Sequence, residues 1–148
     1  MSATQRATWV VLLLAVVTAG CSTDPREAYC DAVSEHQESL GEILGQGGPA
    51  ALLRALPIFR DLQEQAPDDI ADDWQVLVDA LGDLEQAVEE AGADPATYDR
   101  EAPPAGVTAQ EQSRIDAAAA EVGGEGTRAA LAAVEQQARD VCHTPLAL

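Results

Sequence analysis

Residues 70–88 read IADDWQVLVDALGDLEQAV, and this stretch decides the fold class. Its large apolar residues recur three or four positions apart, and on an α-helix they fall within a sector of about 120°. These residues are Ile70, Trp74, Leu77, Val78, Leu81, Leu84 and Val88. Acidic residues fall roughly on the opposite side, at Asp68, Asp72, Asp79, Asp83 and Glu90. The pattern predicts an amphipathic helix with one face in a core and its acidic stripe in water.

Four further segments have the same helical spacing of apolar residues. They run from Arg26 to Gly45, from Pro49 to Leu62, from Thr108 to Gly123 and from Thr127 to Val141. No strand pattern competes with them. We therefore predict an all-α fold, a single small helical bundle of about five helices. The helical domain would span residues 26–148, with a Pro-rich connector at 93–107.

Several residues indicate where these helices begin and end. Asp24 is suited to cap the first helix, and Pro25 suits its first turn. Asp68 and Asp69 favour the start of the third helix through the helix dipole, and Gly92 favours its end. Pro57 lacks a backbone N–H, so the second helix is expected to kink or break there.

The last two helices also have recognisable starts. Thr108 and Glu111 have the spacing of a capping box at the start of the fourth helix. Thr127 is expected to cap the fifth helix.

The beginning of the chain has the organisation of a secretory signal peptide. Arg6 precedes an almost wholly apolar run from Trp9 to Val17, and the small residues Thr18, Ala19 and Gly20 follow it. A positive segment, a short apolar core and a small-residue cleavage site define such peptides. We therefore predict a signal peptide over residues 1–20. A retained membrane anchor stays open as the alternative, because the uncharged window from Ala7 to Thr23 is longer than the apolar run.

The four residues Thr18-Ala19-Gly20-Cys21 resemble the lipobox of bacterial lipoproteins, with Thr18 standing where Leu is usual. That resemblance implies cleavage before Cys21 and a diacylglyceryl group on the Cys21 sulfur. Residues 21–25 would then be a short lipidated tether, and the domain would sit on the outer face of the cell membrane.

The rest of the chain is similar to small, Ala-rich, uncharacterised lipoproteins of actinobacteria. The segments that carry this likeness are Tyr29-Cys30-Asp31-Ala32-Val33, Leu56-Pro57-Ile58-Phe59, Ala66-Pro67-Asp68-Asp69-Ile70 and Asp94-Pro95-Ala96-Thr97-Tyr98. The likeness implies no known activity.

If Cys21 carries lipid, two cysteines remain, Cys30 and Cys142, near the two ends of the mature domain. An exported compartment permits their oxidation. We predict a disulfide that joins the start of the first helix to the end of the fifth, which requires Cα atoms within about 7 Å of each other. Two buried free thiols are the alternative. Bonded cysteines would serve neither as nucleophiles nor as metal ligands.

The charge excludes two classes of partner. The chain has a formal net charge of −18, and loss of residues 1–20 would remove only Arg6 and leave −19. Nucleic-acid affinity depends on Lys and Arg that meet phosphates, and adhesion to anionic lipid depends on basic clusters. We therefore expect this acidic chain to bind neither nucleic acid nor, through its charge, anionic lipid. The 47% hydrophobic content and the strong periodicity favour a folded domain over disorder.

No catalytic, cofactor-binding or metal-binding residue is predicted. The sequence has no G-x-S-x-G, no H-E-x-x-H and no EF-hand spacing. Glu85 and His36 are the candidates for a polar group facing a pocket, with a boundary carboxylate and a rim histidine as the plainer interpretations. A zinc site at His36 and His143 would need further ligands. Trp74 and Phe59 are expected to be core residues.

Two functions are therefore open. The preferred one is a membrane-anchored extracytoplasmic lipoprotein whose domain is a non-enzymatic interaction or envelope module. The alternative is a small-ligand-binding lipoprotein, accessory to a transporter, with a pocket between helices. A closed apolar core favours the first function, and a cavity that holds Glu85 or His36 favours the second.

Overall fold

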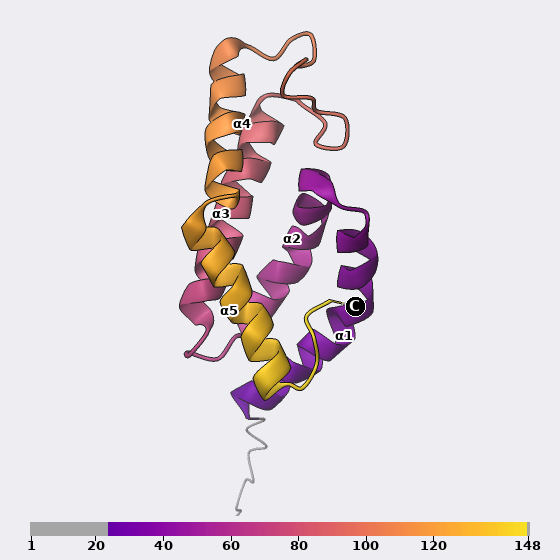
Figure 1. Cartoon of the computed structure of the whole chain (residues 1–148), viewed down its shortest axis with the longest axis vertical. Helices are drawn as coiled ribbons and strands as arrows, with labels where there is room; N and C mark the ends of the chain where they lie inside the picture. Colours follow the sequence, from indigo (N-terminus) through magenta and orange to yellow (C-terminus); the bar gives the residue numbers. More distant parts are fainter. Residues whose placement is uncertain (1–23, 148) are drawn as a thin grey trace, which may run out of the picture.

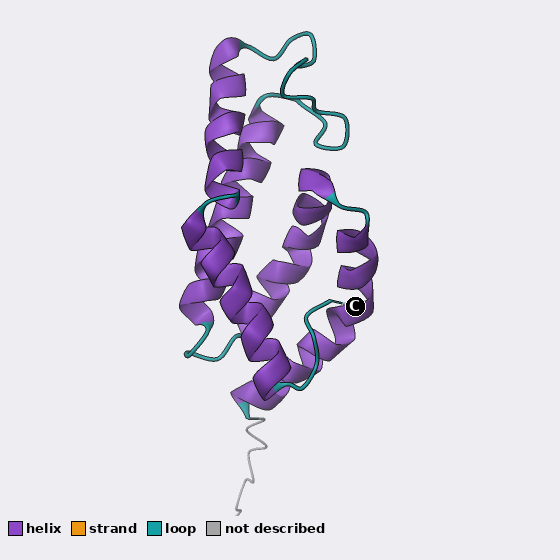
Figure 2. Cartoon of the chain, viewed as in Figure 1, coloured by secondary structure: helices purple, strands orange, loops and turns teal. Residues whose placement is uncertain are grey.

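The computed structural model describes residues 24–147, apart from the side chain of Pro49. These residues form five helices and no strand (Figures 1 and 2). The helices are α1 (Pro25–Gly45), α2 (Gly48–Gln65), α3 (Ala71–Glu90), α4 (Ala109–Val122) and α5 (Glu125–Val141). The predicted all-α fold of about five helices is confirmed. The predicted signal peptide, the segment Thr18–Gly20 and Cys21 lie outside the described residues.

Two helical hairpins and one crossing helix make up the bundle. α1 packs on α2 and α3 packs on α4, and the two hairpins meet where α2 lies against α3. α5 runs back across α3 towards the start of α1 (Figure 1). No helix in residues 24–147 has the length and apolar content that crossing a bilayer demands.

The main core is built around Trp74 of α3. Its side chain is fully buried, its Nε1 donates a hydrogen bond of 3.0 Å to the Tyr29 hydroxyl, and its ring centroid lies 5.8 Å from that of Phe59. Trp74 and Phe59 are thus core residues, as predicted. Burial raises the pKa of Tyr29, the hydrogen bond from Trp74 opposes that shift, and the charge of Asp69 adds to it.

A second, smaller cluster lies between the start of α2, the end of α3 and α4. Its buried members are Leu53, Leu84, Val88 and Ile115. The apolar face of α3 therefore serves two clusters, with Trp74 near one end and Val88 near the other.

Most of the predicted helix ends are confirmed. The Asp24 carboxylate accepts a hydrogen bond of 2.9 Å from the Arg26 N–H, and Pro25 stands in the first turn of α1. At the end of α3, Gly92 has a φ of +61°, and its N–H bonds to the Glu89 carbonyl. A left-handed glycine with such bonds is a common helix terminator.

The capping box of α4 is also confirmed. The Glu111 carboxylate accepts hydrogen bonds of 2.8 Å from the backbone N–H and from the hydroxyl of Thr108. These bonds stabilise the ionised carboxylate, the backbone bond most of all, and they lower the pKa of Glu111.

Of the kink or break expected at Pro57, the break does not occur, because α2 is continuous from Gly48 to Gln65. Pro57 is exposed, while its neighbours Leu56, Phe59 and Leu62 are buried. The missing N–H leaves the Leu53 carbonyl without its helical partner. Burial of the apolar residues on both sides of Pro57 holds the helix together despite that loss.

The expected cap at Thr127 is also wrong. α5 begins at Glu125, its N-cap is Gly124, and Thr127 lies in the first turn. The Thr127 hydroxyl instead donates a hydrogen bond of 2.9 Å to the Glu121 carbonyl near the end of α4. This bond joins two consecutive helices across their tight turn. The third helix, by contrast, starts later than expected, at Ala71, so that Asp72 and Asp73 stand in its first turn.

The disulfide between Cys30 and Cys142 is confirmed, with Cα atoms 5.0 Å apart. It joins α1 to the residue that caps α5. Beyond it the chain turns at His143, Leu146 enters the main core, and Gln37 of α1 donates a hydrogen bond to the Pro145 carbonyl. The end of the chain is therefore fastened to α1.

Gln137 of α5 is a buried polar side chain without a partner within residues 24–147. Its side chain is buried, and neither its amide nitrogen nor its amide oxygen has a hydrogen-bond partner among the described residues. An unpaired buried amide costs free energy, because water no longer solvates it.

Loss of the disulfide should destabilise the protein. The bond closes a loop with a sequence separation of 112, for which chain entropy gives about 4–5 kcal/mol. We expect the Cys30→Ser, Cys142→Ser double variant to lose about 2–4 kcal/mol in its free energy of unfolding, because measured values often fall below that theory. Urea denaturation measures the change. An equal midpoint for the oxidised parent and the variant would contradict it.

Replacement of Gln137 by Leu should stabilise the protein. The Gln137→Leu variant removes two unpaired buried polar atoms and keeps much of the volume, so we expect a gain of about 1–2 kcal/mol. The exposed neighbour Gln136 is the control, and Gln136→Leu should change stability by no more than about 0.5 kcal/mol. A loss of stability in Gln137→Leu would show that this amide is paired.

Candidate functional site

An apolar groove separates the start of α2 from the α3–α4 hairpin. It has a volume of about 520 Å³. Its lining residues are Leu44, Gly47, Gly48, Ala51, Leu52, Leu84, Ala119, Val122 and Gly123. All of them are apolar or glycine, so the groove is a surface that water covers at a free-energy cost.

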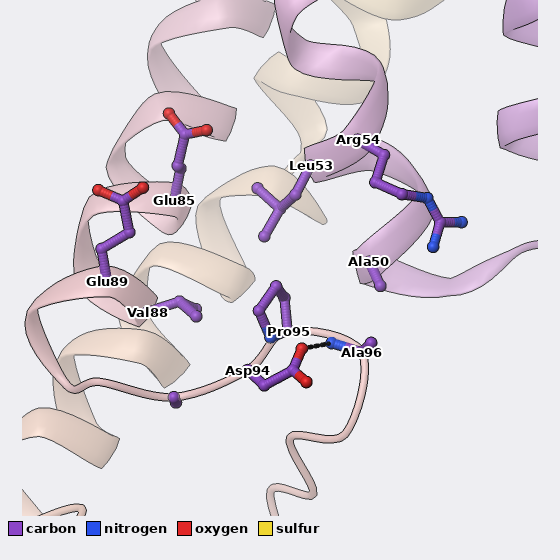
Figure 3. Close-up of a pocket in the computed structure, with 10 residues that line it drawn as sticks. Ala50, Leu53, Arg54, Glu85, Val88, Glu89, Asp94, Pro95 and Ala96 are labelled. Carbon is purple, nitrogen blue, oxygen red and sulfur yellow. Dashed lines mark hydrogen bonds between the residues drawn. The ribbon is translucent and has the colours of Figure 1, made fainter.

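Two further hollows adjoin the groove. One, of about 90 Å³, shares Leu84 and Ala119 with it. The other, of about 320 Å³, shares Leu53, Val88 and Pro95 with the small hollow and opens beneath the connector between α3 and α4 (Figure 3). We call the three hollows together the α2–α4 cleft. The cleft passes along the second apolar cluster.

Tyr98 of the connector contributes the polar group of the cleft. It lines the small hollow, and its hydroxyl is buried without a hydrogen-bond partner among the described residues. Burial raises the pKa of Tyr98, the charge of Asp116 raises it further, and Arg100 opposes both. The hydroxyl is therefore neutral at physiological pH and able to donate or accept a hydrogen bond.

Local hydrogen bonds hold this part of the connector. The Asp94 carbonyl accepts from the N–H groups of Thr97 and Tyr98, and the Asp94 carboxylate accepts from the N–H of Ala96 at 2.8 Å (Figure 3). Arg100 pairs with Asp116 of α4 at 2.9 Å. The connector thus has a defined shape, and Tyr98 is placed by turns rather than by a helix.

Acidic side chains surround the mouth of the cleft. Glu85 and Glu89 of α3 and Asp94 of the connector line the 320 Å³ hollow together with Arg54. In Figure 3 the side chain of Arg54 points away from Leu53 and Pro95, and its guanidinium donates a hydrogen bond to Gln46. The mouth therefore has a negative potential above an apolar floor.

The structure separates the two polar candidates from the sequence. Glu85 lies at the mouth of the cleft, where its carboxylate pairs with Arg60 at 2.8 Å, as expected for a boundary carboxylate. His36 lies between α1 and α2, where its Nε2 is 2.7 Å from the Asp61 carboxylate, and it does not line the cleft. His143 is exposed after the disulfide.

The acidic stripe of α3 lies on an outer surface. Asp72, Asp79, Asp83 and Glu90 are exposed, as predicted for a solvated face. Within residues 24–147, no three His, Cys, Asp or Glu side chains gather in a way that could hold a metal ion.

The chain matches no protein-family model, no curated protein and no solved structure.

Sequence reasoning missed the cleft and Tyr98. Leu53, Leu84, Val88 and Ile115 have ordinary helical spacing, and spacing does not show that two hairpins diverge. The one available signal is an aromatic residue within a Pro-rich connector, since Tyr98 follows Asp94-Pro95-Ala96-Thr97. Aromatic side chains in loops are rarely left in water.

The unpaired Tyr98 hydroxyl gives a stability test. Tyr98→Phe removes a buried hydroxyl that has no partner, so the protein without ligand should gain about 1 kcal/mol in its free energy of unfolding. Tyr29→Phe is the matched control, because that hydroxyl accepts from Trp74 and its loss should cost about 1 kcal/mol. Urea denaturation of both variants should give opposite signs. The same sign for both would contradict the unpaired state of Tyr98.

Proposed function

We propose that this protein is a lipid-anchored lipoprotein on the outer face of the bacterial cell membrane, and that its domain is a non-enzymatic interaction or envelope module. The observation that carries the proposal is the lipobox-like Thr18-Ala19-Gly20-Cys21, which ends three residues before Asp24 caps the first helix of the domain. Lipid on Cys21 would hold the start of α1 close to the bilayer.

The position of the cleft supports a role directed away from the membrane. α1 has 21 residues, which span about 31 Å at 1.5 Å per residue. Its first residue, Pro25, is the last residue of the predicted tether, and Leu44 in its last turn lines the α2–α4 cleft. In Figure 1 the start of α1 and the connector over the cleft lie at opposite ends of the molecule. A tether at one end leaves the other end open to a partner from solution.

The acidic charge supports the same orientation. A mature charge of −19 repels the anionic head groups of a bacterial bilayer. The domain is therefore held at the membrane by its lipid alone, with its surface free for contacts.

A second candidate function is supported by the cleft itself. A small-ligand-binding lipoprotein, accessory to a transporter, needs a largely apolar hollow with a few placed polar groups. The α2–α4 cleft has apolar walls, Tyr98 with its unpaired hydroxyl among its lining residues and Glu85 at its mouth. Thermal unfolding in the presence of small molecules distinguishes the two candidate functions. A ligand-binding domain gains thermal stability from one class of small molecule, whereas an interaction module does not.

Anchoring is tested at Cys21. Protein purified from the membranes of the producing bacterium should lack residues 1–20 and carry a diacylglyceryl group, and Cys21→Ser should release the protein or leave it as an uncleaved precursor. Stable anchoring requires more than one acyl chain, which a diacylglyceryl group supplies. Intact-mass spectrometry reads both changes. An unmodified Cys21 thiol in membrane-purified protein would end the proposal.

A further inference from the structure

We infer that the α2–α4 cleft binds a small amphipathic molecule with an apolar body and a positively charged head group. The inference deepens the second candidate function and rests on it. Its support is the coincidence, in one place, of apolar walls, an unpaired hydroxyl and a negatively charged mouth.

The walls specify an apolar body. Leu53, Leu84 and Val88 connect the linings of the three hollows, and Ile115 joins them in the smallest hollow. The two larger hollows, of about 520 and 320 Å³, have the size of small-molecule sites, which occupy about 300–1,000 Å³. An alkyl chain or a ring system placed there would displace water from apolar surface on both sides.

The Tyr98 hydroxyl specifies one polar contact. A buried polar group without a partner is uncommon, and a bound group is one explanation of it. Tyr98 lines the hollow that joins the other two, so a molecule that bridges them would pass this side chain, and a small shift of the side chain would bring its hydroxyl, which is closed to water, into contact. An amine or alcohol could donate to the phenol oxygen, and a neutral oxygen acceptor could receive its proton.

The mouth specifies the sign of the head group. Arg60 pairs with Glu85, but Glu89 has no ion-pair partner among the described residues. The Asp94 carboxylate accepts a hydrogen bond from the N–H of Ala96 and has no ion-pair partner there either. Arg54 is directed towards Gln46. Glu89 and Asp94 both line the 320 Å³ hollow, so their charges attract a cationic head group and repel an anionic one.

The test uses three probes that differ only in their head group, namely n-octylamine, 1-octanol and octanoate. The full lipidated chain is placed in phosphatidylcholine nanodiscs, and its thermal unfolding is followed by near-ultraviolet circular dichroism. The probes also enter the bilayer, but they do so equally for every variant, so comparison among variants removes that contribution.

The parent protein should be stabilised most by octylamine. At tenfold excess over the dissociation constant we expect the unfolding midpoint to rise by about 3–6 °C. Octanol should bind more weakly, and octanoate should give no shift. Equal shifts with all three probes, a larger shift with octanoate, or no shift with octylamine would overturn the inference.

Variants place the binding in the cleft. Ala119→Leu fills the junction of two hollows and should abolish the octylamine shift, whereas Ala120→Leu, next along α4 and outside the lining, should keep it. Tyr98→Phe should weaken octylamine binding by about threefold to tenfold, the equivalent of one hydrogen bond. A full octylamine shift in Ala119→Leu would place binding elsewhere and overturn the inference.

A surface variant keeps the test valid if Ala119→Leu does not fold. Glu89→Gln leaves the walls intact and should reduce the preference for octylamine over octanol by about threefold, and an unchanged preference would refute the assigned head-group sign. Lipidation of Cys21 is measured separately by mass. If Cys21 carries no lipid, the same probes are applied to the purified chain in solution, so anchoring can fail while the cleft binds its probe, and the reverse outcome is equally distinguishable.

Discussion

The burial of Trp74 is the contact on which the rest of the fold depends. Its indole packs beside Phe59 of α2, and its N–H reaches the hydroxyl of Tyr29 of α1. One side chain thus connects three helices, and the hydrogen bond removes the cost of burying both polar atoms. Apolar packing alone would tolerate rotation of α1 against α3. The hydrogen bond between Trp74 and Tyr29 is directional, so it restricts how α1 is oriented against α3.

The disulfide and the end of the chain close the same half of the molecule. Cys30 lies one residue beyond Tyr29, so the covalent link from α5 enters α1 beside the Trp74 contact. Leu146 enters the same core, and Gln37 binds the Pro145 carbonyl. The other half has neither disulfide nor chain end. There α2 and the α3–α4 hairpin meet through the small cluster of Leu53, Leu84, Val88 and Ile115, and the cleft lies where that cluster is incompletely covered.

Local rules predicted much of the fold and little of the candidate site. The face of residues 70–88, the caps at Asp24, Thr108 and Gly92, and the Cys30–Cys142 pairing follow from spacing or from residue chemistry, and the structure has them all. Two of the departures arose where tertiary contacts override a local preference. Pro57 stays in a helix because its neighbours are buried, and the Thr127 hydroxyl bonds to the preceding helix instead of capping its own. The angle between two hairpins is a property of their packing, so no local pattern contains it.

The two unpaired buried polar side chains of the described region have different meanings. Gln137 lies on the buried face of α5 and lines none of the three hollows of the cleft, so a partner would have to replace packed side chains. Its cost is therefore a cost to folding, which the rest of the core offsets. Tyr98 lines a hollow of about 90 Å³ that continues into two larger hollows. A partner in these hollows contacts the Tyr98 side chain, and it reaches the buried hydroxyl when that connector side chain shifts. An unpaired buried polar group therefore indicates imperfect packing at Gln137 and a candidate ligand contact at Tyr98. The difference is that hollows adjoin Tyr98 and none of the three adjoins Gln137.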